Sequence, residues 1–210
     1  MFKRARGGLL VASLYAQEVE LLVMTARDMV AIVEEPPDGE VRDRLYPRAY
    51  LDPTEEKAQG EYDALVHDDL VQSRRTALEV VVAGLEGAEP NRRGLIEVSL
   101  SPEEEMQWLT AVNDARLVIG TALGITEDAD TDFEPGDPRF EYGVLYAWLT
   151  QLHFELVTLL LDEIGEAGTD DPRLDAPGGP VDPGDRHLPG ETPGNAPGDA
   201  PDDEPGRDDG

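Results

Sequence analysis

Three polar residues inside an otherwise apolar stretch have side chains that could bind a ligand or one another. Asn113, Asp114 and Arg116 lie in the segment 101–125, where they interrupt a stripe of apolar residues. Asp114 and Arg116 stand two positions apart, so they do not share a helix face and cannot pair directly. We expect Arg116 to pair instead with an acid on the second or fourth predicted helix. The group would form either a partly buried polar network that specifies the packing or a site for an anion or other ligand between helices.

No other group of residues has the composition and spacing of a catalytic or metal site. His67 stands beside Asp68 and Asp69, but neighbours in a helix do not share a face, so we interpret the segment as exposed and polar. His153 falls on an apolar helix face, as a core histidine with a hydrogen-bond partner does. No Glu-x-x-His pair of a di-metal bundle is present, and the absence of cysteine excludes thiolate chemistry. The sequence therefore predicts no catalytic residues, no metal and no cofactor.

The chain is strongly acidic, with a formal net charge of −29 from 46 acidic and 17 basic residues. Such a field repels nucleic acid and anionic lipid unless a local basic patch overrides it. The basic residues form three small clusters with no interleaved aromatic residues, so we expect any DNA binding through them to be weak. These candidate basic contacts are Lys3, Arg4, Arg6, Arg74, Arg75, Arg92 and Arg93.

The segment that holds the three polar residues is the best-defined helix in the sequence. Ser101 is a good N-cap, Pro102 suits the first helical position, and Glu104 completes a capping box. Gly124 stands where a helix commonly ends on a left-handed residue. These signals predict a helix over 101–123.

Apolar residues at helical spacing predict three further helices, and period-two alternation predicts a strand. The helices span roughly 15–34, 52–86 and 139–164. Residues 2–12 could form a hairpin around Gly7-Gly8, and the strand 95–100 needs partners for its backbone groups. The fold is therefore predicted to be mainly α, a four-helix core with a small antiparallel β-sheet made of the N-terminal hairpin and 95–100. A winged-helix-like arrangement is the alternative.

The apolar stripes assign an inward face to each predicted helix. Trp108 and Trp148 each stand one position from a stripe, so we expect both at the edge of the core. Residues 40–51 show no clear period and should pack as a connecting loop, and Gly60 is a possible break in the second helix. The residues expected to face inward near the start of the second and fourth helices are Tyr62, Leu65, Leu70 and Tyr142.

The C-terminal segment has a different composition from the rest of the chain. Residues 166–210 hold nine prolines, nine glycines, 13 acids, 3 bases and no aromatic residue. Because such a segment buries too little apolar surface to offset its ordering entropy, we expect a disordered acidic tail after a folded domain over 1–165. We find no signal peptide and no run approaching 18 apolar residues, and therefore expect no membrane association.

The run from Trp108 to Thr121, WLTAVNDARLVIGT, resembles the hallmark of an actinobacterial family long known only as a domain of unknown function. The family is now often named after the oxidative-stress transcriptional regulator AosR. The resemblance spans about 5–162. Its other pieces are Glu18, Leu21-Leu22, Arg48-Ala49-Tyr50 and the run 146–150, YAWLT.

The resemblance implies a cytoplasmic regulatory protein that acts on transcription with RNA polymerase or a sigma factor. It supplies no catalytic residue, and its implied redox sensing would need a thiol that this chain lacks. We therefore predict a non-enzymatic, AosR-like regulator that acts mainly through protein contacts. An acidic adaptor or scaffold without a role in transcription is the alternative. The candidate interaction or polar-network residues are Trp108, Asn113, Asp114, Arg116, Arg48, Tyr50 and Trp148.

Overall fold

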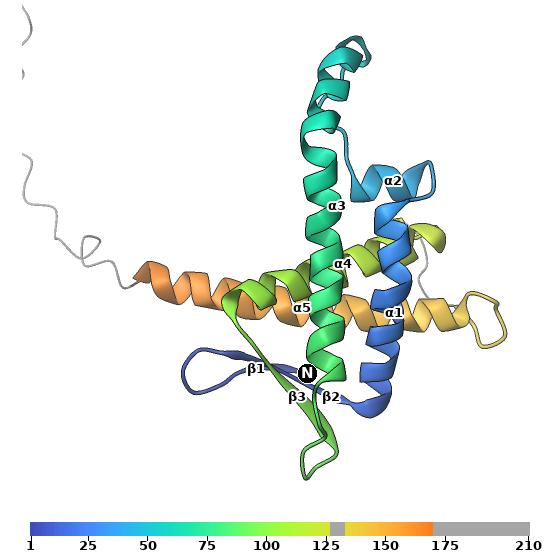
Figure 1. Cartoon of the computed structure of the whole chain (residues 1–210). Helices are drawn as coiled ribbons and strands as arrows, with labels where there is room; N and C mark the ends of the chain where they lie inside the picture. Colours follow the sequence, from blue (N-terminus) through green and yellow to red (C-terminus); the bar gives the residue numbers. More distant parts are fainter. Residues whose placement is uncertain (127–132, 170–210) are drawn as a thin grey trace, which may run out of the picture. The chain divides into compact units, whose positions relative to one another are not determined.

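The structure is a computed structural model that describes residues 1–126 and 133–169 (Figure 1). The elements in this part of the chain are β1 (Phe2–Arg4), β2 (Leu10–Tyr15), α1 (Ala16–Glu34), α2 (Glu40–Leu45), the 3₁₀ helix η1 (Pro53–Glu55), α3 (Glu56–Glu86), β3 (Leu95–Leu100), α4 (Pro102–Ala122) and α5 (Phe140–Thr169). The predicted mainly helical fold is confirmed. The predicted disordered tail falls almost wholly on residues 170–210, which lie outside the described residues.

The three strands form one antiparallel sheet in the order β1-β2-β3. The predicted hairpin joins β1 to β2, and its turn residues Gly7 and Gly8 have φ angles of 106° and 87°, which glycine adopts without steric cost. β3 pairs with β2 along its whole length. Because side chains alternate along a strand, Leu10, Ala12 and Leu14 all point to the helices and are fully buried. The strands thus form the small antiparallel sheet that the sequence predicts beside the helices.

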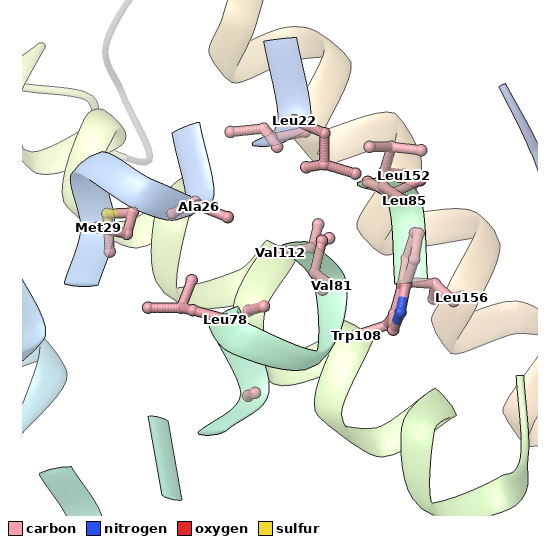
Figure 2. Close-up of a cluster of buried hydrophobic side chains, with 14 of the residues drawn as sticks. Leu22, Ala26, Met29, Leu78, Val81, Leu85, Trp108, Val112, Leu152 and Leu156 are labelled. Carbon is pink, nitrogen blue, oxygen red and sulfur yellow. The ribbon is translucent and has the colours of Figure 1, made fainter. Parts of the chain in front are cut away.

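The core lies where α3 packs against α1 and α4, with α5 packed on the other side of α4. Figure 2 shows side chains from all four long helices meeting there. Trp108 is completely buried in this cluster, beside Leu156 of α5. The prediction that Trp108 lies at the edge of the core is wrong because the sheet also covers it: the ring of Phe2 meets the indole edge-to-face at 6.0 Å.

The N-terminal half of α3 extends beyond the helices that pack on its C-terminal half (Figure 1). α3 has 31 residues and α1 has 19, which correspond to lengths of about 46 Å and about 28 Å. The shorter helix cannot cover the longer one, so Tyr62, Leu65 and Leu70 are exposed and their predicted inward orientation is wrong. The helix runs through Gly60 without a break.

Two further predictions near helix ends are corrected by the structure. Residues 40–45 form the short helix α2 rather than a loop, and its last residue, Leu45, is completely buried. Tyr142, in the first turn of α5, is largely exposed. α5 also continues to Thr169, beyond the predicted end at 164.

α5 is unusually apolar for a helix that lies at the side of the core. Its segment Phe140–Asp162 is long and apolar enough to cross a membrane, judged by length and composition alone, with a mean hydropathy of 1.4. The sequence prediction concerns a continuous run of apolar residues. The average composition of this helix nevertheless reaches the level of a membrane span. Leu149, Leu152 and Leu156 lie fully buried in the shared core, but only 17% of this apolar segment is buried.

The start of α4 is fixed by the predicted capping box. The Ser101 hydroxyl accepts a hydrogen bond from the Glu104 N–H at 3.4 Å, and the Glu104 carboxylate accepts from the Ser101 N–H at 2.8 Å and hydroxyl at 2.7 Å. These hydrogen bonds from Ser101, backbone first and side chain second, lower the pKa of Glu104. The predicted C-terminal signal is also present, since Gly124 has a φ of 70°.

Removing this cap should weaken the fold by a predictable amount. Ser101→Ala should lower the free energy of unfolding by about 1 kcal/mol and return the pKa of Glu104 towards its ordinary value of 4.5. A lowered carboxyl pKa stabilises the fold above the unfolded pKa and stops doing so as the pH falls through the folded pKa. The difference between wild type and variant should therefore shrink below pH 4.5. Urea unfolding at several pH values, with an NMR titration of Glu104, measures both; an unchanged pKa in the variant contradicts the capping account.

Candidate interaction site

The predicted polar trio is organised by an arginine from another helix. Arg74 of α3 donates from Nη1 to Oδ1 of Asp114 on α4 and from Nη2 to the backbone carbonyl of Leu45 at 2.6 Å. Its guanidinium also lies 5.3 Å from the centre of the Tyr46 ring, within cation–π range. One side chain thus joins the end of α2 to α3 and α4. Arg74 is one of the candidate nucleic-acid contacts, and its pairing inside the fold favours a structural role for it.

Asp114 is the most deeply buried member of this network. Only 1% of the residue is exposed, and burial raises the pKa of its carboxyl while the hydrogen bond from Arg74 opposes the rise. Among the described residues, its Oδ2 and the Nε of Arg74 have no hydrogen-bond partner. The ring of Tyr46 lies against the Arg74 guanidinium. The Tyr46 hydroxyl donates to the carbonyl of Val33 at 2.6 Å. The network therefore retains one acceptor and one donor that a water or ligand group could engage.

Among the described residues, Arg116 pairs with no acid, contrary to the prediction. Its Nη2 donates to Oδ1 of Asn113 at 3.1 Å, a contact that a spacing of three residues allows on one helix face. Its Nε, like the indole nitrogen of Trp148, is buried without a hydrogen-bond partner in the described part of the chain. His153 is half-buried near this group rather than fully in the core, and burial, followed by the charge of Arg116, lowers its pKa.

The remaining predicted interaction residues do not join the network. Arg48 and Tyr50 lie in the exposed loop before η1, where Arg48 Nη2 donates to Oε1 of Glu56 at 2.8 Å and the Tyr50 N–H donates to Oε1 of Gln59 at 2.9 Å. They therefore hold this loop against the start of α3. His67, expected to be exposed, is half-buried. Its ring centre lies 5.2 Å from that of Tyr46, a contact between helices that the sequence did not indicate.

Four of the seven candidate basic contacts are held by acids of the same chain. Arg4 forms two hydrogen bonds, at 2.5 and 3.0 Å, with the buried carboxylate of Glu105. Lys3 pairs with Glu97 at 2.8 Å. Arg74 pairs with Asp114, and Arg75 pairs with Glu34 and Glu79. Arg6, Arg92 and Arg93 are exposed and form no ion pair with a described residue.

Arg92 and Arg93 border a hollow beside the sheet. This open hollow has a volume of about 780 Å³, and Lys3 and Tyr15 also line it. The hollow brings exposed cations together with the exposed ring of Tyr15, as in proteins that bind single-stranded nucleic acid. Glu18 and Glu97 line the same hollow, so its charge is mixed.

DNA binding by the isolated protein should be weak and should disappear as salt is raised. Only Arg6, Arg92 and Arg93 among the candidate contacts are available to neutralise phosphates, and counterion release scales with that number. Fluorescence anisotropy with a promoter duplex in a salt titration measures this. Replacing Arg92 and Arg93 by alanine should remove most of the signal, whereas Arg75→Ala should not. Nanomolar binding at ~150 mM salt would contradict the prediction.

A groove runs between α3 and α4. Two hollows of about 540 and 420 Å³ adjoin at Ser73 and Thr110, which line both. The first also has Asp69, Glu103 and Met106 in its walls. The second reaches the polar network, and its other lining residues are Leu70, Arg74, Leu109, Asn113, Asp114 and His153.

The groove is lined mostly by polar and acidic residues, with Met106, Leu70 and Leu109 as its large apolar side chains. Met106 is 54% exposed, and Asp69 and Glu103 form no ion pair with a described residue. Sequence reasoning missed this site because it placed Leu70 in the core. The sequence offers one signal for this site, which is the position of Met106 in the first turns of α4.

Comparison with known proteins places the chain in a family. Residues 1–160 match the model of a family described as a domain of unknown function, DUF2017. The chain belongs to this family. It is also 30% identical over 139 residues to a protein of Mycobacterium leprae (strain TN) that carries the name of an oxidative stress regulator, AosR. That match covers 61% of this chain and 61% of the relative. No solved structure matches the chain.

The family model covers the sheet, the polar network and the groove, because all three lie within residues 1–160. The resemblance to the AosR-like family noted from the run 108–121 is therefore confirmed at the level of the family. The regulatory role comes from the name of the relative alone, and it is carried to this chain as a proposal below.

Proposed function

We propose that this chain is a non-enzymatic cytoplasmic regulator that acts on transcription mainly through protein contacts. The name of the similar Mycobacterium leprae protein supports a regulatory role linked to oxidative stress. The observation that carries the choice of protein over DNA is the internal pairing of Lys3, Arg4, Arg74 and Arg75. Cations that neutralise acids of their own chain cannot also neutralise phosphates without breaking those pairs.

The groove between α3 and α4 is the surface best suited to a protein partner. Beside it, the exposed half of α3 presents Leu65, which is 78% exposed, and the groove itself presents Met106. Apolar side chains in a groove are what an amphipathic helix of a partner requires. Asp69 and Glu103 in the walls favour a partner segment with basic residues at its rim.

The polar network supports a structural role for its charged groups rather than a catalytic one. Arg74 and Asp114 neutralise each other and bind the end of α2, so their side chains are fixed by the fold. Arg116 is fixed by Asn113. A general base or nucleophile must be able to reach a bound substrate. These charged groups instead hold three helices together.

Affinity capture from a lysate of the source organism tests the proposal. The tagged full chain should recover RNA polymerase or a sigma factor, and the recovery should survive nuclease treatment. Met106→Arg, which places a cation and a larger side chain in the groove, should reduce recovery at least about tenfold, equivalent to about 1.4 kcal/mol. Met24→Arg is the matched control, because Met24 is also 54% exposed but lies on α1.

The outcomes separate the proposal from its alternatives. Recovery that nuclease abolishes would show bridging by DNA and contradict the protein-contact account. Recovery of basic proteins without polymerase or sigma would favour an acidic adaptor or scaffold, the second candidate, which the net charge of −29 favours. Equal loss in the Met106 and Met24 variants would remove the groove from the account.

A further inference from the structure

The outward face of α5 is an apolar surface that the described part of the chain leaves uncovered. Val144, Phe154 and Leu161 are 55%, 64% and 60% exposed, on the side of the helix away from Leu149 and Leu152. No aspartate, glutamate, lysine or arginine occurs from 142 to 154, in a chain in which 30% of residues are charged. Large exposed apolar patches of this kind mark interaction sites.

The exposed residues of this face follow the spacing of a helix–helix seam. They recur at alternating intervals of three and four, the heptad pattern of helices that pack along their length. The seam spans about 26 Å at 1.5 Å per residue, and each of its residues is exposed. Its residues are Val144, Ala147, Gln151, Phe154, Thr158 and Leu161.

We propose that a second copy of this chain packs on the seam, so that the protein forms a dimer through α5. Two chains that each carry −29 repel one another over most of their surfaces, and they can approach only where neither presents an unpaired charge. The one carboxylate beside the middle of the seam, Glu155, already accepts hydrogen bonds from the Phe2 N–H at 3.1 Å and from Gln151 at 3.0 Å. It also pairs with the N-terminal amine at 2.9 Å.

The two helices pack antiparallel in this dimer. The seam positions are symmetric about the point between Gln151 and Phe154, so an antiparallel copy places each seam position opposite another. In the antiparallel pair Val144 meets Leu161 of the second copy, and Gln151 meets its Phe154. An open hollow of about 300 Å³ beside Phe154, lined also by Phe2 and Leu159, leaves room for a side chain of the second copy.

A lipid bilayer is a less suitable occupant of this face. Leu149, Leu152 and Leu156 are fully buried against the rest of the core, so α5 could enter a bilayer as a span only by leaving that core. An anionic membrane surface would also repel a chain of net charge −29. The dimer covers the seam and leaves the core intact.

Sedimentation equilibrium of the full chain tests the dimer. We expect a monomer–dimer equilibrium with a Kd of about 10 μM or below, and tighter association at ~1 M salt than at ~150 mM because salt screens the repulsion. The double substitution Phe154→Lys and Leu161→Lys should weaken association at least a hundredfold. The control, Leu51→Lys with Leu65→Lys, changes residues that are 86% and 78% exposed by the same charge and should leave the dimer intact.

Circular dichroism confirms that each variant is folded. A wild-type chain that remains monomeric at ~100 μM, or a dimer that the α5 substitutions do not weaken, overturns the proposal. Co-flotation of the wild-type chain with vesicles of neutral lipid, lost in the α5 variant, would instead identify a membrane as the occupant and overturn it as well. These outcomes are independent of polymerase capture, so the dimer and the proposed function can fail separately.

Discussion

Replacing Arg74 with methionine should lower the free energy of unfolding by about 3–5 kcal/mol, because it leaves a buried carboxylate without its partner. Asp114 is 1% exposed, and its hydrogen bond comes from Arg74. The substitution also removes the donor to the Leu45 carbonyl, so the end of α2 should loosen from α3. Urea unfolding followed by circular dichroism measures the loss.

Two control variants test whether burial causes this effect. Arg75→Met removes a neighbouring arginine whose side chain is 45% exposed, against 19% for Arg74, and surface pairs of this kind contribute about 1 kcal/mol or less. Replacing Arg74 by methionine and Asp114 by leucine together should recover most of the loss, since no charge then remains buried. If Arg74→Met costs no more than Arg75→Met, the network does not join the helices as described.

Trp108→Ala should cost a similar amount, about 3–5 kcal/mol, because it empties the centre of the core. The side chain is fully buried next to Leu156 of α5 (Figure 2). It also lies edge-to-face with Phe2 of β1. Its removal therefore weakens the contacts of α4 with both α5 and the sheet.

Trp148→Ala supplies the comparison for Trp108. Trp148 is only half-buried, so its truncation removes less buried surface and should cost clearly less. Thermal and urea unfolding of both variants give the two free energies. Equal losses would contradict the placement of Trp108 at the centre and Trp148 at the side of α5.

Features that depend on local sequence could be predicted, and those that depend on how helices cross could not. The capping box of Ser101 and Glu104 involves residues three apart and was found directly. The hairpin at Gly7-Gly8 and its pairing with 95–100 followed from the need of backbone groups for partners. By contrast, α2 has six residues, which are too few to show a helical period. The sequence therefore predicts a loop there.

The candidate site shows the same limit more sharply. Arg74 and Asp114 stand 40 residues apart, and Arg4 and Glu105 stand 101 apart, so only the packed helices show that these cations are already paired. The exposure of Leu65 follows from α3 being longer than α1, which sequence periodicity does not reveal. Arg116 and Asn113 were the exception: their spacing of three allowed the contact, and the sequence interpretation overlooked it.

Direct binding of purified components tests the central claim, regulation through protein contacts, more closely than any other measurement. The immobilised full chain is exposed in turn to RNA polymerase core, to sigma-bound holoenzyme and to promoter duplex at ~150 mM salt, and binding is followed by biolayer interferometry. The account predicts saturable binding to polymerase or holoenzyme, weakened by Met106→Arg but not by Met24→Arg, and no saturable binding to DNA alone. Tight binding to the duplex with none to polymerase would contradict it.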